Sequence, residues 1–177
     1  MSALNESVSM LNESMSAINR HTTLFFDASV LVAGAHSARG GSALLLEACR
    51  LGGFTAQSSF LVLLEALHTL KRNFPERSQT RFTAYLAAID WELLPVPSER
   101  ELEKYASLID AKDLHVLAAA VEGASQFLLT LDRRHILAAA EAVQAAGLPI
   151  EILRPGDFIQ QYYPLHEKHS SLPPPRR

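Results

Sequence analysis

The strongest candidate for chemistry in this sequence is Asp27, a carboxylate placed between two apolar runs. It follows Leu24–Phe26 and precedes Val30–Val32, near the end of a segment with the composition of a buried strand. An ionised carboxylate among apolar groups is costly to desolvate unless it is hydrogen-bonded, paired or bound to a metal. An Asp that reaches an exposed strand end and caps the next turn is the alternative, but the apolar flanks favour a functional role. Ser29 offers a hydroxyl to the same site or to local backbone.

Asp132 is the second candidate, because it follows the strand pattern at 126–130 and precedes a helical pattern. An Asp at such a junction is commonly a helix N-cap, and that interpretation stands beside the functional one. Ligands in parallel sheets bind at the carboxyl ends of the strands, so a carboxylate here could meet Asp27. Thr130 adds a neighbouring hydroxyl that could orient a metal-bound water.

The residues around Asp113 and Glu65 do not decide whether these two carboxylates belong to the site. Asp113 lies at the start of a helical pattern, where the macrodipole favours an acid, and Asp110 competes for any role given to it. Glu65 falls off the main apolar face of its own helix, which favours a solvated side chain. The first turns of that helix are apolar all round and indicate burial, so periodicity does not decide between the two interpretations.

The elements that must position these acids alternate between strand and helix. Strands are expected at 24–34, 54–57, 91–96, 126–130 and 150–153. Helices are expected at 42–51, 58–74, 77–89, 98–109, 112–123, 133–147 and 155–163, with Ser59 as the N-cap of the second and Gly147 ending the sixth. This order predicts an α/β fold of three layers, α/β/α, with a central parallel sheet of about four to five strands.

The composition is that of one globular domain. A chain of 177 residues with 48% apolar and 20% charged residues can bury a substantial core. The net charge of −3 does not indicate nucleic-acid binding, so any such contact needs a local basic patch. The single Cys49 excludes an intramolecular disulfide and a cysteine-rich zinc site. No apolar run is long enough for a membrane span and no secretory signal is present, which predicts a cytoplasmic protein.

The two ends of the chain differ from the middle. Residues 1–22 form an expected N-terminal extension, in which Leu4, Val8, Leu11, Met15 and Ile18 follow a short heptad pattern. Residues 164–177 end in SSLPPPRR and are expected to be a disordered Pro-rich tail. The expected domain therefore covers residues 23–163.

Four segments, in this order, resemble the PIN-domain family: FFDASVLV, LLEALHTL, DAKDLHVLAAAVEGASQFLLTLD and the helix after it. The similarity runs from about Leu24 to Ile159. The last block is the most specific, since it combines an Asp, an Ala-rich helix, an apolar strand and Thr-x-Asp. PIN domains are metal-dependent ribonucleases, and many bacterial ones are VapC-type toxins with a small antitoxin partner.

The resemblance implies a catalytic site made of Asp27, Glu65, Asp113 and Asp132, with Ser29 and Thr130 as supporting hydroxyls. It implies Mg²⁺ or Mn²⁺ as the cofactor, because a hard cation relieves the repulsion between crowded carboxylates. It also implies an RNA substrate, an antitoxin partner and a homodimer. Some family members carry a further acidic residue shortly after the Thr-x-Asp motif. In this chain the motif is followed by Arg133, Arg134 and His135, so it stays open whether the site binds one metal ion or two.

The sequence also leaves alternatives to catalysis by this set. A haloacid-dehalogenase-like phosphatase begins from a strand-end Asp, but its DxD motif is not met because position 29 is Ser. A non-catalytic PIN-like module that binds RNA or protein is the other alternative, although all four acidic positions are filled. The expected contacts to RNA phosphates are Arg39, Lys71, Arg72, Arg133 and Arg134.

Overall fold

The protein is described here by a computed structural model of residues 17–175. Its centre is a five-stranded sheet in the order β3-β2-β1-β4-β5, and every neighbouring pair of strands is parallel. The strands are β1 (Thr23–Phe26), β2 (Thr55–Ser59), β3 (Trp91–Leu94), β4 (Phe127–Leu129) and β5 (Glu151–Leu153). The parallel sheet expected from the sequence is confirmed.

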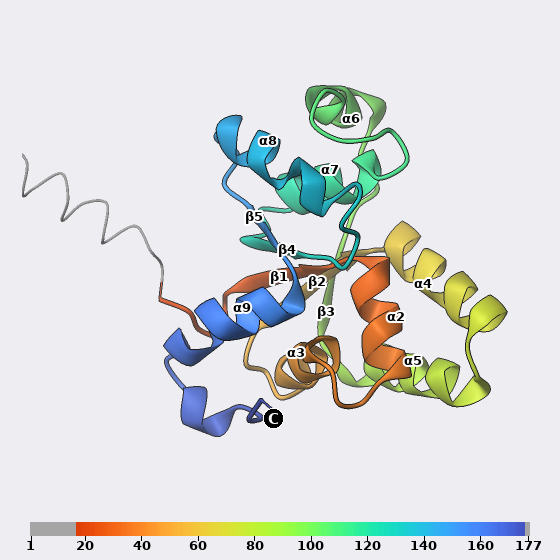
Figure 1. Ribbon diagram of the computed structural model, residues 1–177, viewed down its shortest axis with the longest axis vertical. Coiled ribbons are helices and arrows are strands. Elements are labelled where there is room, and N and C mark those ends of the chain that lie inside the picture. The colour runs from red at the N-terminus through yellow and green to blue at the C-terminus, as the bar shows by residue number, and fades with distance from the viewer. Residues whose placement is uncertain (1–16, 176–177) are drawn as a thin grey trace, which may run out of the picture.

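Helices cover both faces of the sheet and give the three layers that the sequence predicts (Figure 1). Helices α6, α7 and α8 lie above the sheet in that view, and α2, α3 and α5 lie below it. The helices are α2 (Ala28–His36), α3 (Gly41–Arg50), α4 (Phe60–Asn73), α5 (Glu76–Ala88), α6 (Glu99–Tyr105), α7 (Leu114–Glu122), α8 (Ala140–Ala145) and α9 (Pro155–Gln161). Short 3-10 turns are η1 (Leu137–Ala139), η2 (Tyr163–Leu165) and η3 (His169–Ser171).

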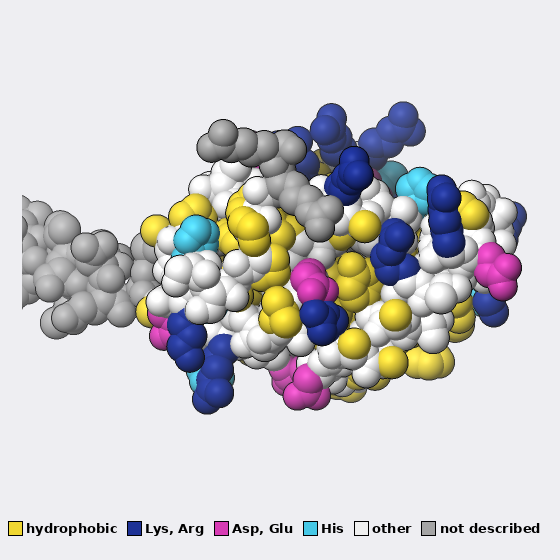
Figure 2. Space-filling view, turned by 90° about the horizontal axis from the view of Figure 1, so that it is seen from below, with side chains coloured by type: hydrophobic (Ala, Val, Ile, Leu, Met, Phe, Trp, Pro, Cys, Tyr) yellow, Lys and Arg dark blue, Asp and Glu magenta, His cyan; other side chains and the backbone are white. Residues whose placement is uncertain are grey.

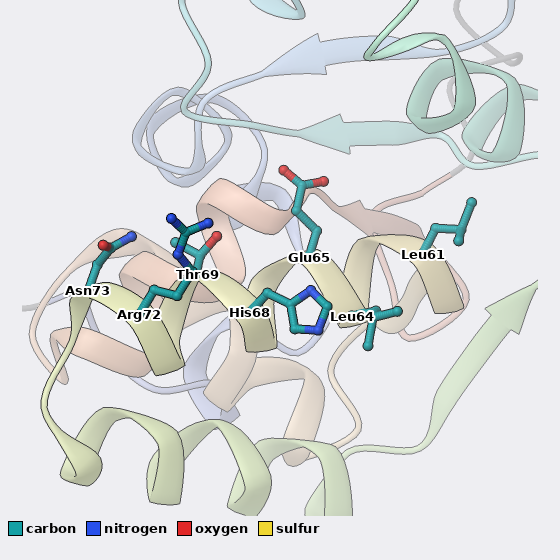
Figure 3. Close-up of a pocket in the computed structure, with 7 residues that line it drawn as sticks. All are labelled: Leu61, Leu64, Glu65, His68, Thr69, Arg72 and Asn73. Carbon is teal, nitrogen blue, oxygen red and sulfur yellow. The ribbon is translucent and has the colours of Figure 1, made fainter.

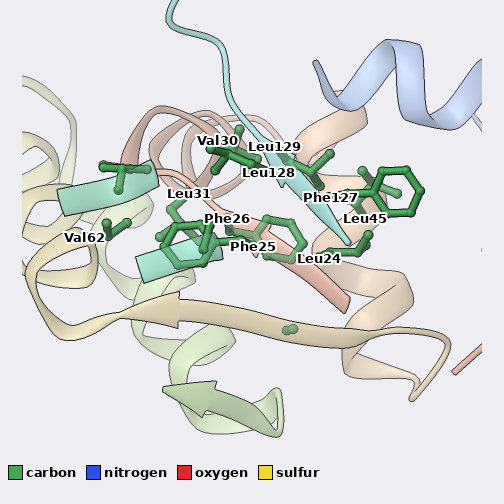
Figure 4. Packing of buried hydrophobic residues seen from close by; sticks show 14 of the residues in the cluster. Leu24, Phe25, Phe26, Val30, Leu31, Leu45, Val62, Phe127, Leu128 and Leu129 are labelled. Atoms are coloured by element: carbon green, nitrogen blue, oxygen red, sulfur yellow. The ribbon is translucent and has the colours of Figure 1, made fainter. Parts of the chain in front are cut away.

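Strand β1 is the central strand and the most buried part of the core. Leu24, Phe25 and Phe26 have no exposed surface, and Figure 4 shows them packed among residues of α2 and β4. Because β2 and β4 both run parallel to β1, these three strands end at the same edge of the sheet. The residues that follow them are brought together there, as ligand sites in parallel sheets require.

The strand expected at 24–34 is only half correct. The chain leaves the sheet after Phe26, and Ala28–His36 forms helix α2 instead. Most of this helix is buried, including Val30, Leu31 and Val32. A helix that is apolar on all sides has no amphipathic period, so in sequence it resembles a buried strand.

The helix expected at 133–147 begins later than predicted. The side chain of Asp132 accepts hydrogen bonds from the backbone N–H groups of Arg134 and His135, which holds this segment in a turn. Helical structure begins only at η1 and continues into α8. Gly147, with a positive φ of 71°, follows the end of α8 as expected.

The C-terminal segment differs from the expected disordered tail. Leu172 is 9% exposed, and the hydroxyl of Tyr163 donates a hydrogen bond to the carbonyl of Pro173 at 2.7 Å. The backbone N–H of Glu167 donates to the carbonyl of Ile18, a core residue. Both segments therefore pack on the sheet domain past the expected boundaries at 23 and 163. The other heptad positions, from Leu4 to Met15, lie outside the described residues.

Within residues 17–175, no helix is both long enough and apolar enough to cross a membrane. Cys49 is buried, with 5% of its surface exposed, and belongs to the core as its apolar sequence context suggests. Burial raises the pKa of its thiol, which makes it a poor nucleophile.

Candidate metal centre

Asp27 lies where β1 ends and α2 begins, and it is 5% exposed. Its backbone N–H donates to the carbonyl of Leu129, which extends the β1–β4 pairing by one step. Asp27 occupies the N-cap position of α2, yet its side chain makes no capping hydrogen bond. The carboxylate is therefore not explained by helix capping.

Two hydroxyls hold the Asp27 carboxylate. Its Oδ2 atom accepts hydrogen bonds from Ser29 Oγ at 2.5 Å and from Thr130 Oγ1 at 2.8 Å. Ser29 Oγ in turn accepts from the N–H of Leu131, and Thr130 Oγ1 accepts from the N–H of Asp132. The start of α2 and the loop after β4 are thus joined through one carboxylate.

Asp132 lies directly after this hydroxyl network. Its carboxylate accepts the two backbone N–H bonds of the following turn, and its Oδ2 is 3.0 Å from Nδ1 of His135. Partial burial acts to raise the pKa of Asp132, but these hydrogen bonds outweigh it and hold the pKa below its ordinary value. Asp132 is therefore a turn-forming residue and also an ionised carboxylate at the sheet edge.

Asp113 contributes the third carboxylate, from the start of α7, which lies on the face of the sheet opposite to α2. It is the N-cap residue of α7 but makes no side-chain capping hydrogen bond. Its Oδ2 atom is buried and has no hydrogen-bond partner among the described residues. Burial raises the pKa of Asp113; Lys112 opposes this, and the charge of Asp132 adds to it. Asp110, which competes for this role in the sequence, is 66% exposed at its side chain.

A buried carboxylate oxygen without a donor costs free energy, of the order of 1–3 kcal/mol or more for a charged group. A divalent cation with oxygen ligands would satisfy this atom and offset the repulsion from Asp132. One ligand atom from each of Asp113, Asp132 and His135 lies within 4.8 Å of the others, which fits a shared ion. The donors present therefore suit a hard or borderline divalent metal.

Glu65 reaches the same region from α4. Much of its side chain is open to solvent, as the helical wheel indicated. Partial burial nevertheless raises its pKa, and the charges of Asp27 and Asp113 add to the shift. Figure 3 shows Glu65 on the side of α4 that faces the β4 region, together with Thr69 and Arg72, whereas His68 points elsewhere. Glu65 is thus at the rim of the acidic group.

The family profile of the PIN domain matches residues 23–134. The chain belongs to the PIN-domain family. Family members are nucleases, which agrees with an acidic group at the carboxyl edge of the sheet. The family match excludes the haloacid-dehalogenase-like alternative.

Two solved structures are similar to this PIN domain. One is VapBC2 from Rickettsia felis bound to a DNA fragment from its promoter, with 15% identity, 75% of this chain and 98% of that chain covered, and a TM-score of 0.50. The other is VapC20 from Mycobacterium tuberculosis, a Sarcin-Ricin loop cleaving toxin, with 14% identity, 72% and 98% covered, and a TM-score of 0.44. At 15% identity, the similarity to VapBC2 concerns the fold. No curated protein sequence matches the chain.

His135 is the residue of this PIN domain that sequence reasoning did not assign to the site. It lies three residues after Asp132 and contacts its carboxylate. Its side chain also comes within 3.9 Å of Asp113 and 3.7 Å of Asp110. The Asp-x-x-His spacing of Asp132 and His135 was the available signal in the sequence.

The expected RNA-contacting cations are all exposed but do not lie together. Arg72 lines the same pocket as Glu65, and Arg133 and Arg134 follow Asp132 directly. Arg39 lies instead in a pocket between α3 and α9, away from the acidic group. On the face of the PIN domain seen in Figure 2, basic side chains are scattered among apolar and acidic ones and form no continuous basic surface.

Proposed function

We propose that this PIN domain is an endoribonuclease that depends on Mg²⁺ or Mn²⁺ and hydrolyses phosphodiester bonds in single-stranded or structured RNA. The metal would be held by Asp113, Asp132 and His135, whose ligand atoms lie within 4.8 Å of one another, with Asp27 as a further ligand and Glu65 at the rim. The observation that carries the proposal is the buried Asp113 Oδ2 atom, which has no hydrogen-bond partner beside a second carboxylate. Acidic groups are crowded in this way where a cation compensates them.

A bound divalent ion supplies a water of lowered pKa and neutralises charge on the phosphate. The rest of the site contributes positioning. Ser29 and Thr130 fix the rotamer of Asp27, so that this carboxylate does not have to reorganise when it meets a cation. Glu65, with its raised pKa and its access to solvent, is suited to hold a proton from the attacking water.

The basic residues near the acids would bind the RNA backbone. Arg72 lies beside Glu65, and Arg133 and Arg134 extend from the loop after Asp132. Phosphate contacts of this kind position a nucleic acid without reading its sequence. Lys71 and Arg39 would add charge farther from the cleavage point.

We also propose a homodimer and a small antitoxin partner for this chain. VapBC2 from Rickettsia felis has a similar fold, and the resemblance to VapC-type PIN domains implies an antitoxin partner. Exposed apolar side chains support a protein interface: Phe60 is 62% and Leu93 52% exposed, and both line one pocket together with Leu64. Exposed clusters of large apolar residues are typical of surfaces that bind protein.

The test is cleavage of labelled RNA, both single-stranded and folded, by the purified full chain. We expect cleavage with Mg²⁺ or Mn²⁺, none with excess chelator, and none with Asp27→Asn. The matched control is Asp90→Asn, which alters an exposed Asp outside the acidic group and should cleave like wild type. RNA binding without cleavage under all metal conditions would instead support the non-catalytic module.

A further inference from the structure

Lys112 lies against the proposed metal ligands, although neither the fold nor the proposed function assigns it a role. Its Nζ atom is 3.0 Å from Nδ1 of His135 and 3.6 Å from Oδ2 of Asp113. The same Nδ1 atom is 3.0 Å from Oδ2 of Asp132. The ammonium group is therefore adjacent to the atoms that would bind the cation.

These contacts cannot all be satisfied together. An ammonium is only a donor, and Nδ1 of His135 carries either one hydrogen or one lone pair. It can donate to Asp132 or accept from Lys112, but not both. The Lys112 contact to Asp113 is too long for a good hydrogen bond, and the carboxylate oxygen stays without a partner. Lys112 thus contributes positive charge to the cluster without satisfying the buried Asp113 oxygen.

Lys112 is also largely exposed to solvent. Its side chain is 58% exposed and ends in a compact ammonium on a flexible stem. Its charge is felt by both Asp113 and Glu65, the two acids whose pKa values are raised. A divalent ion bound to the Asp113 oxygen at about 2.0–2.6 Å would face this ammonium at close range, and the two cations repel each other.

We propose that Lys112 is a tethered cation that competes with the divalent metal for the Asp113–Asp132–His135 group and lowers the metal affinity of the site. The inference rests on the proposed function, because it takes this group to be the metal site. In this scheme Lys112 acts through its positive charge and does not bind the metal. Removing its charge tightens metal binding, and keeping the charge with another side chain preserves the weaker binding.

The experiment is a calorimetric titration of the full chain with Mn²⁺ in the absence of RNA. We expect Lys112→Met to bind Mn²⁺ about three- to tenfold more tightly than wild type, the effect of losing one partly exposed charge beside the ion. Lys112→Arg should bind like wild type. Lys104→Met is the matched control: it removes the same charge from an exposed Lys that pairs with Glu122, at the opposite end of α7. Its affinity should stay within about twofold of wild type.

Unchanged or weaker Mn²⁺ binding by Lys112→Met would overturn the inference, as would equally tight binding by Lys112→Arg. These outcomes leave the proposed function standing, because wild type still binds the ion. Absence of Mn²⁺ binding by the wild-type chain would remove both the proposed function and the inference. Lys112 is exposed, so the substitutions should not disturb folding, and circular dichroism of each variant checks this.

Discussion

The side chains of Asp27 and Thr130, 103 residues apart in the sequence, are joined by a hydrogen bond of 2.8 Å. The Thr130 hydroxyl also accepts the N–H of Asp132, so one oxygen holds two of the acidic residues in place. The bond links the central strand to its neighbour at the edge where the site lies. It makes the position of Asp27 a property of the β1–β4 pairing as much as of β1 itself.

Thr130→Val tests this link, because valine keeps the shape and removes the hydroxyl. We expect the free energy of unfolding to fall by about 1–3 kcal/mol, since the buried Asp27 carboxylate loses a donor. Urea denaturation measures the change. Thr80→Val, on the exposed face of α5, is the matched control and should cost under about 0.5 kcal/mol. Equal effects in both variants would show that the buried bond has no special weight.

Asp113→Asn should stabilise the metal-free protein and remove its response to metal. The variant relieves the repulsion between Asp113 and Asp132 and allows an amide donor at this position. In chelator, we expect the melting temperature of the variant to lie above that of wild type by about 2–4 °C for each kcal/mol of free energy of unfolding gained. Adding Mn²⁺ should raise the melting temperature of wild type but not that of the variant. Thermal unfolding with and without Mn²⁺ measures both effects. Asp110→Asn, at the exposed neighbouring acid, should keep the metal response.

The pH dependence of the metal-free protein should carry the signature of Asp113. Burial is the main cause that raises its pKa above the ordinary value of 3.8. Between that value and the raised pKa the folded state binds more protons than the unfolded state, so the contribution of Asp113 to stability falls as pH rises. Above the raised pKa the loss is complete.

Asp113→Asn lacks this ionisation and isolates its contribution from that of Asp132, whose pKa is lowered. The difference in free energy of unfolding, variant minus wild type, should grow as pH rises above the ordinary pKa of 3.8 and level off above the raised pKa of Asp113. Urea unfolding in chelator at several pH values measures it. A difference that stays constant or shrinks would contradict the raised pKa.

Leu172→Ala tests the packing of the C-terminal segment. Leu172 is 9% exposed and reaches the core beside Gly53, so its truncation should lower the free energy of unfolding by about 1–3 kcal/mol. Leu165→Ala is the matched control, because Leu165 is 58% exposed. Limited proteolysis gives a second readout, with faster cleavage after residue 163 in the Leu172 variant. A neutral Leu172→Ala would mean that the tail contributes nothing to stability.

Phe60→Asp tests the proposed homodimer. Phe60 is the first residue of α4 and 62% exposed, and an acid is favoured at a helix start, so the monomer should fold normally. We expect the wild-type chain to sediment as a dimer and the variant as a monomer. Leu51→Asp changes a Leu that is 52% exposed after α3 and should leave the mass unchanged. A wild-type monomer at all concentrations would refute the dimer.

Several parts of the molecule follow from local sequence. The apolar period and the N-cap at Ser59 predict α4, and the structure shows that Ser59 Oγ accepts from the N–H of Val62. The alternation of strands and helices predicts a parallel sheet, because each crossover requires a helix. Asp27 can also be recognised from local sequence, because a charge within an apolar run has a high desolvation cost.

Other parts depend on contacts between distant segments. Whether 28–36 is strand or helix depends on what surrounds it, because its residues are apolar on every side. The unpaired Asp113 oxygen, the approach of His135 and the ammonium of Lys112 arise only when the end of β4 meets the start of α7. Sequence alone determined which residues are acidic, which segments are apolar and in what order strands and helices follow one another along the chain. The tertiary structure decided which charges lie within a few ångströms of one another, because electrostatic energies depend on distance and burial and not on sequence separation.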